Sequence, residues 1–122
     1  GEIGDFVALE VNMRPGGGYI PDMINYSHSL SMFKIWADMI AFDKRTTEDV
    51  NDDYYCVFAG RRDNAEYNVS HEEMLSRYGY AMMMSPRIAP ALAPARGNQA
   101  YICRFRTEEE RDKFLADACD RK

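Results

Sequence analysis

One stretch near the start of the chain limits what this sequence can fold into more than any other. Residues 6–12 read Phe-Val-Ala-Leu-Glu-Val-Asn, and residues 14–18 follow as Arg-Pro-Gly-Gly-Gly. Branched and aromatic side chains favour β-strands, whereas glycines allow backbone conformations that other residues avoid. We therefore predict a strand over residues 6–12 that ends in a glycine-rich loop.

Two polar side chains share one face of this predicted strand. Because side chains alternate along a strand, Glu10 and Asn12 point the same way, about 7 Å apart. A carboxylate and an amide oxygen are ligands that Mg²⁺ accepts, so the pair can hold a magnesium ion. Arg14 follows, and its planar fork can hold a phosphate or carboxylate oxygen. The alternative interpretation is a solvated strand face before an ordinary turn. A charged residue in a strand of buried type needs a partner, however, and a metal ion supplies one.

The rest of the chain divides into two parts. Residues 29–42 carry apolar side chains at helical spacing, which predicts a helix after the glycine-rich loop. Residues 43–53 are almost entirely polar and indicate a connection. We predict an N-terminal segment over residues 1–45 and a small C-terminal module over residues 46–122.

The C-terminal module is predicted to be an antiparallel sheet with two helices. Ser70 with Glu73, and Thr107 with Glu110, form the Ser/Thr-x-x-Glu pattern that begins a helix. The three expected strands lie at residues 54–59, 80–85 and 100–106. The whole chain is therefore expected to belong to the α+β class.

Charge and composition argue against several kinds of partner. The chain has 20 acidic and 15 basic residues, a net charge of -5, which disfavours a broad nucleic-acid surface. No apolar run approaches the roughly 20 residues that span a bilayer. The three cysteines lack the spacing of a zinc site and fit reduced thiols of a cytoplasmic protein. We expect no nucleic acid, no membrane and a cytoplasmic location.

Residues 9–17, Leu-Glu-Val-Asn-Met-Arg-Pro-Gly-Gly, resemble the late metal-binding motif of ATP-grasp enzymes. The Arg-Pro-Gly-Gly variant is similar to that of carboxylate–amine ligases and carbamoyl-phosphate-synthase-like proteins. Residues 54–62 and 70–73 look like the C-terminal module of that group. The resemblance implies the C-terminal piece of an ATP-grasp domain (strand, glycine-rich loop and helix), followed by a small antiparallel sheet with two helices.

The resemblance also implies roles for individual residues. Glu10 and Asn12 would bind the magnesium ions that hold the phosphates of ATP. Gly16 and Gly17 would let the backbone approach the cofactor closely. Arg14 would stabilise the acyl phosphate formed on a small-molecule carboxylate, which an amine or ammonia then converts to an amide-type product. Such catalysis relies on positioning and on neutralising negative charge.

The family's other nucleotide-binding elements do not occur in these 122 residues. We expect the chain to begin inside a longer protein, whose remaining ATP-grasp lobes complete the site. Mg²⁺ and ATP are expected in that full-length protein, and the isolated chain is expected to bind neither and to be inactive. A homodimer is possible. The alternative is a non-catalytic binding or assembly module in which the metal motif is vestigial.

Overall fold

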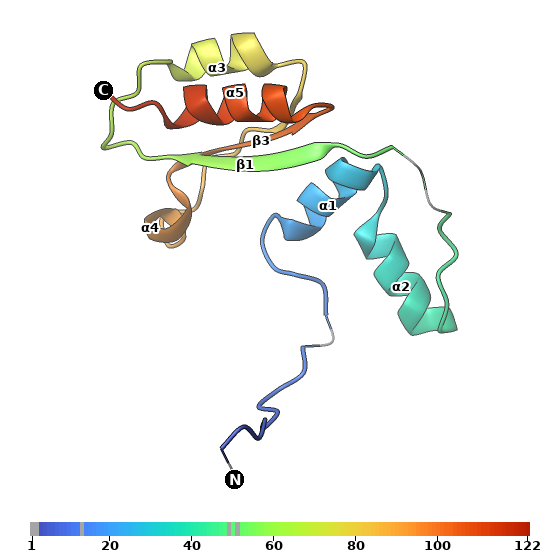
Figure 1. Ribbon diagram of the computed structural model, residues 1–122. Helices are drawn as coiled ribbons and strands as arrows, with labels where there is room; N and C mark the ends of the chain where they lie inside the picture. Colours follow the sequence, from blue (N-terminus) through green and yellow to red (C-terminus); the bar gives the residue numbers. More distant parts are fainter. Residues whose placement is uncertain (1–2, 13, 49, 51) are drawn as a thin grey trace.

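The computed structural model of the protein describes residues 3–12, 14–48, 50 and 52–122 (Figure 1). Within these residues the chain is a mixed α+β structure with five helices and one three-stranded antiparallel sheet. The helices are α1 (Ile20–His28), α2 (Met32–Phe42), α3 (His71–Tyr78), α4 (Ala93–Arg96) and α5 (Glu108–Cys119). The strands are β1 (Tyr55–Arg61), β2 (Met82–Met84) and β3 (Gln99–Phe105).

The sheet has the order β1-β3-β2, so the last strand in sequence lies in the middle. The antiparallel register of β1 against β3 runs from Tyr55 opposite Phe105 to Arg61 opposite Gln99. β2 pairs with the other edge of β3, with a register shift between Met82 and Met84. The α+β class and the three predicted strands are confirmed.

The main core lies between the sheet and helices α3 and α5, which together cover one of its faces (Figure 1). Alternate side chains of β3 point into it, because successive residues of a strand face opposite ways. Phe114 of α5 is fully buried, with its ring 5.1 Å from that of Tyr78 and 5.5 Å from that of Phe105. The buried core residues are Val57, Ala59, Val69, Met74, Tyr78, Ala81, Tyr101, Cys103, Phe105, Phe114 and Ala118.

Both predicted capping patterns begin helices. The Ser70 hydroxyl accepts a hydrogen bond from the Glu73 amide at 3.1 Å, and the Glu73 carboxylate accepts one from the Ser70 amide at 2.8 Å. The Thr107 hydroxyl likewise accepts from the Glu110 amide at 3.3 Å. Each bond satisfies an amide that the first helical turn leaves free.

Helix α1 packs on the opposite face of the sheet, beside β1 (Figure 1). The Tyr54 amide donates to the Ser27 carbonyl at 2.7 Å, and the Ser29 hydroxyl donates to the Asp52 carboxylate at 2.9 Å. These bonds tie the residues before β1 to the end of α1. The N-terminal segment is therefore attached to the C-terminal module through its first helix.

The single helix predicted over residues 29–42 is wrong at its start. Ser29 adopts a left-handed conformation with φ of 51° and ends α1, and α2 begins only at Met32. Ser31 caps α2 by accepting from the Lys34 amide at 3.3 Å, while the Asn25 side chain accepts from the Met32 amide at 2.6 Å. The residues before Ser29 form a separate helix that their apolar spacing did not reveal.

The predicted strand over residues 6–12 is also wrong in this structure. The segment has no regular secondary structure and extends away from the rest of the chain (Figure 1). Phe6 is 101% exposed and Leu9 is 95% exposed. A strand needs a neighbour for its amides and carbonyls, and none of the three strands pairs with this segment. In the described part of the chain, no helix is long and apolar enough to cross a membrane.

Candidate functional site

The two predicted metal ligands lie side by side. The Asn12 amide donates a hydrogen bond to the Glu10 carboxylate at 2.8 Å, and both residues are exposed. Their oxygens suit a hard cation such as Mg²⁺. Among the residues with assigned positions, no three His, Cys, Asp or Glu side chains form a metal-binding group. This pair can therefore supply part of a metal site, with its other ligands coming from elsewhere.

Arg14, the predicted catalytic residue, is exposed, and no hydrogen bond or ion pair joins it to another residue of the described chain. The structure does not bring it into contact with Glu10 or Asn12. Met13, which separates Arg14 from Asn12, lies outside the described residues. The guanidinium is consequently free to meet an anion.

The two predicted cofactor-binding glycines differ in their surroundings. A side chain at Gly16 would come within 3.0 Å of Ile20, whereas nothing lies within 4 Å of the corresponding position at Gly17. Gly18, the third glycine, has a φ of +63°, and a side chain there would strike the guanidinium of Arg96. The glycine-rich loop thus allows a residue from the C-terminal module to approach its backbone.

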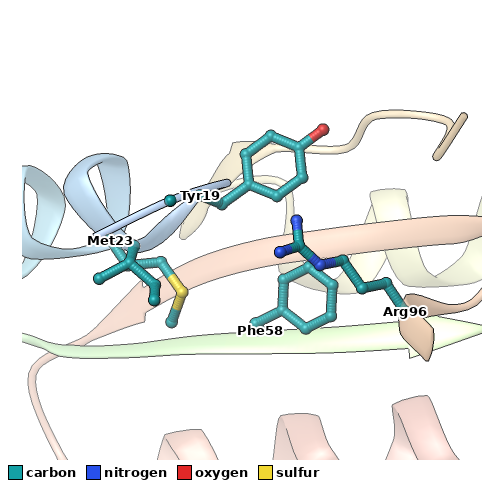
Figure 2. A pocket seen from close by; sticks show the side chains of 6 residues that line it. Tyr19, Met23, Phe58 and Arg96 are labelled. Atoms are coloured by element: carbon teal, nitrogen blue, oxygen red, sulfur yellow. The ribbon is translucent and has the colours of Figure 1, made fainter. Parts of the chain in front are cut away.

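Gly17 borders a cavity of about 250 Å³ between α1, β1 and α4, here called the Arg96 pocket. Its lining residues are Gly17, Tyr19, Ile20, Met23, Phe58 and Arg96. The rings of Tyr19 and Phe58 are stacked, with centroids 6.4 Å apart and planes inclined by 26°. Figure 2 shows the Arg96 guanidinium beside the Phe58 ring, with Tyr19 and Met23 around it.

Close backbone packing fixes the position of Arg96. A side chain at Gly60 of β1 would collide with the Arg96 carbonyl, so α4 can approach β1 only because Gly60 has none. Gly97 ends α4 with a φ of +82°, and its amide donates to the Ala93 carbonyl at 2.9 Å. The next amide, of Asn98, donates to a β1 carbonyl at 2.7 Å. The arginine therefore projects from a short, well-anchored turn.

The Arg96 side chain is half-buried, and across the described residues no hydrogen bond or ion pair involves its guanidinium. Arg62, by contrast, donates to the Ala93 and Pro94 carbonyls of α4 at 3.4 Å and 2.9 Å. Arg104 donates to the Tyr26 carbonyl at 3.3 Å. Arg96 thus retains donors that comparable arginines of the module have already used.

A larger cavity of about 660 Å³, here called the His71 pocket, lies near the same end of β1 but on the opposite face of the sheet, beside Arg61 and Tyr101. The His71 ring nitrogen Nδ1 hydrogen-bonds the Tyr101 hydroxyl at 2.7 Å. Burial raises the pKa of Tyr101, so its hydroxyl stays protonated at neutral pH. Arg87 at the rim is held by both oxygens of Asp63, at 2.9 Å and 2.5 Å. The charged side chains that line this pocket are therefore already partnered.

The cysteines do not form a reactive site. Burial raises the pKa of Cys56 to about 11 and that of Cys103 to about 12. Both thiols therefore remain protonated at neutral pH, where the thiolate is the nucleophile. All three cysteines are free, as the sequence predicted.

Comparison of the chain with protein-family models, curated proteins and solved structures found no match. The site must be interpreted from its own geometry. Sequence reasoning selected Gly17 but missed Arg96. The signal for it is Gly97, since a glycine commonly follows the last residue of a helix.

Proposed function

We propose that this chain is the C-terminal part of an ADP-forming ATP-grasp ligase that joins a carboxylate to an amine or ammonia through an acyl phosphate. The observation that carries the proposal is the 2.8 Å contact between Asn12 and Glu10. It joins an amide and a carboxylate on an exposed segment, and Arg14 follows Asn12 two residues later in the sequence. That combination suits a metal–phosphate site better than it suits a plain surface turn.

The exposed apolar side chains of the same segment support the proposal. Phe6 is 101%, Leu9 is 95% and Val11 is 77% exposed. Side chains of this type are costly to leave in water, at about 25 cal/mol per Å² of apolar surface. A segment that favours strands, and that pairs with no strand among the described residues, fits a sheet that other ATP-grasp lobes complete. In this proposal the full-length protein is a cytoplasmic, carbamoyl-phosphate-synthase-like ligase, and its remaining lobes complete the sheet.

In the complete ligase, Glu10 and Asn12 would hold Mg²⁺, and Gly16 and Gly17 would let the backbone approach the nucleotide. The metal would supply charge neutralisation at the phosphates. Arg14 adds a fixed positive charge beside the reacting carboxylate, where negative charge develops during transfer. The residues of this chain thus provide orientation and charge.

The test is Glu10→Gln in the complete protein, which keeps the size of the side chain and removes its charge. We expect the rate of ADP formation to fall by roughly 100-fold or more, as it does when one group that stabilises transition-state charge is lost. Glu109→Gln is the matched control, because Glu109 is an exposed carboxylate on α5. Equal turnover by both variants and the unmodified protein would remove Glu10 from the metal site.

A second candidate is a non-catalytic binding or assembly module. The observation that favours it is that the C-terminal module has its own core, without any contribution from residues 3–12. The exposed apolar side chains of α2, including Phe33, Ile40 and Phe42, offer a surface for a homodimer. The coding sequence upstream separates the two candidates: further ATP-grasp lobes support the ligase, whereas a natural start near residue 2 supports the module.

A further inference from the structure

We propose that the Arg96 pocket binds a small carboxylate that carries a short aromatic or aliphatic group. The guanidinium holds the carboxylate, and the apolar wall around it holds the rest of the molecule. This inference does not depend on the ligase proposal, because the pocket is built from the glycine-rich loop, α1, β1 and α4 of this chain.

The unpaired charge of Arg96 is the first part of the argument. Removing a cation from water is costly unless a partner compensates for it, and the part of the chain that the structure describes offers Arg96 no hydrogen bond or ion pair. By contrast, Arg61, which is more deeply buried, donates to three carbonyls. The planar fork of an arginine matches the two oxygens of a carboxylate. A carboxylate ligand therefore supplies the compensation that Arg96 lacks.

The walls of the pocket define the rest of the ligand. Apart from Arg96, its lining side chains come from Tyr19, Ile20, Met23 and Phe58, none of which carries a charge at neutral pH. The cavity of about 250 Å³ equals roughly eight water volumes of 30 Å³ each. A single ring with a short acid group fits this volume. The stacked Tyr19 and Phe58 rings favour a flat apolar group.

A monoanion fits this pocket better than phosphate does. Only one cation lines it, and no acidic side chain among its lining residues competes for that cation. A phosphate at neutral pH carries nearly two charges and needs more donors than one arginine provides. The single guanidinium with an apolar wall therefore selects a carboxylate.

The pocket is also preorganised. The Arg96 backbone lies directly against Gly60, and its guanidinium lies directly against Gly18. Both ends of the side chain are thus positioned before any ligand arrives. Binding then immobilises few additional groups, which lowers its entropic cost.

The experiment is a titration of the chain with phenylacetate, followed by amide chemical shifts in NMR spectra. We expect a Kd of about 1 mM or lower, with shifts centred on Gly17, Phe58 and Arg96. Phenylacetamide, which has the same shape without the charge, is expected to bind at least 10-fold more weakly. Acetate, which lacks the ring, and inorganic phosphate are also expected to bind at least 10-fold more weakly.

Variants provide the second arm. Arg96→Met keeps the length of the side chain and is expected to weaken phenylacetate binding by at least 10-fold, whereas Arg87→Met, in the His71 pocket, should leave it unchanged. Arg96→Gln replaces Arg96→Met if the latter does not fold, as judged by circular dichroism. Equal affinity for phenylacetate and phenylacetamide would overturn the proposal without any variant. So would tighter binding of phosphate, shifts centred on the His71 pocket, or undiminished binding by the Arg96 variant.

Discussion

Replacing Arg61 with methionine tests whether one buried side chain holds the C-terminal helix to the sheet. Arg61 is 5% exposed, and its guanidinium donates to the carbonyls of Val69 at 2.7 Å, Asp117 at 2.8 Å and Ala118 at 2.8 Å. Two of these acceptors lie in the last turns of α5, whose carbonyls attract a cation. Methionine keeps most of the apolar stem but donates no hydrogen bond, so all three carbonyls lose their partner.

The size of the effect follows from these three bonds. A hydrogen bond from a charged donor contributes about 1.5–3 kcal/mol, but the arginine also loses hydration when it is buried. Allowing about 1 kcal/mol net for each bond, we expect Arg61→Met to lower the free energy of unfolding by about 3 kcal/mol. Arg61→Lys should lower it by about 2 kcal/mol, since an ammonium cannot reproduce the planar fork.

Equilibrium unfolding in urea, followed by circular dichroism, measures this difference as a lower midpoint with an unchanged slope. Arg87→Met is the matched control, because Arg87 forms an exposed ion pair with Asp63, and its loss should change the free energy of unfolding far less than Arg61→Met does. The reasoning is refuted if Arg61→Met unfolds within about 0.5 kcal/mol of the unmodified chain, since the three bonds would then make no net contribution.

Three further changes test the core, its pH dependence and its thiols. Phe114→Ala empties a fully buried site and should lower the free energy of unfolding, measured in urea, by about 3–5 kcal/mol. A decrease below about 1 kcal/mol would contradict the burial of Phe114 in the core. Tyr78→Phe removes the 2.6 Å bond that, more than any other interaction, lowers the pKa of Asp117. Because a depressed carboxyl pKa stabilises the fold above its unfolded value of about 3.9, the difference in unfolding free energy between this variant and the unmodified chain should be full at pH 7. This difference should shrink as the pH falls through the pKa of Asp117 in the folded state. A difference that stays constant with pH would contradict the role of Tyr78 in lowering the pKa of Asp117. Mass-spectrometric mapping of alkylation should find exposed Cys119 modified first and Cys103, whose pKa burial raises to about 12, only in urea; equal rates would contradict the burial.

Short-range signals made the C-terminal module predictable. The Ser70–Glu73 and Thr107–Glu110 pairs each act within one helical turn, so their spacing alone identifies where a helix begins. The three strands were found because β-forming residues gather there between polar turns. The pairing order was not predictable, since β1 and β3 are distant in sequence and only the packed structure brings them together.

The N-terminal segment was harder to predict, because its local preferences are not decisive. Residues 6–12 have the composition of a strand, but strand formation depends on a neighbour, and no strand in the described part of the chain pairs with them. The break at Ser29 depends on a left-handed serine and on the Asn25 side chain, which caps the next helix. Neither is visible in the periodicity of apolar residues. Strand propensity is thus a statement about the environment that a segment requires.

The candidate site also contains residues that the sequence indicated and one that it did not. Glu10 and Asn12 were paired from the alternation of a strand that the structure does not form; their side chains meet instead through a hydrogen bond between residues two apart. Arg96 was not predicted, because its proximity to Gly18 depends on α4, a single turn inside a stretch rich in proline and alanine. Contacts between residues far apart in sequence cannot be derived from spacing along the chain.

The arginines of the module show why position alone does not identify a binding residue. Arg61 and Arg96 lie close to the same end of β1, and both are partly or wholly removed from solvent. Arg61 donates hydrogen bonds to three carbonyls, so it stabilises the fold and has few donors available for a ligand. Arg96 lies in an apolar pocket with no acceptor among the described residues, and a half-buried, unpaired charge of that kind favours an incoming anion. Whether an arginine's donors already have acceptors within the protein therefore separates the structural Arg61 from Arg96, which is proposed to bind a ligand. The two methionine variants test this distinction. Arg61→Met should mainly lower the free energy of unfolding, and Arg96→Met should mainly weaken phenylacetate binding.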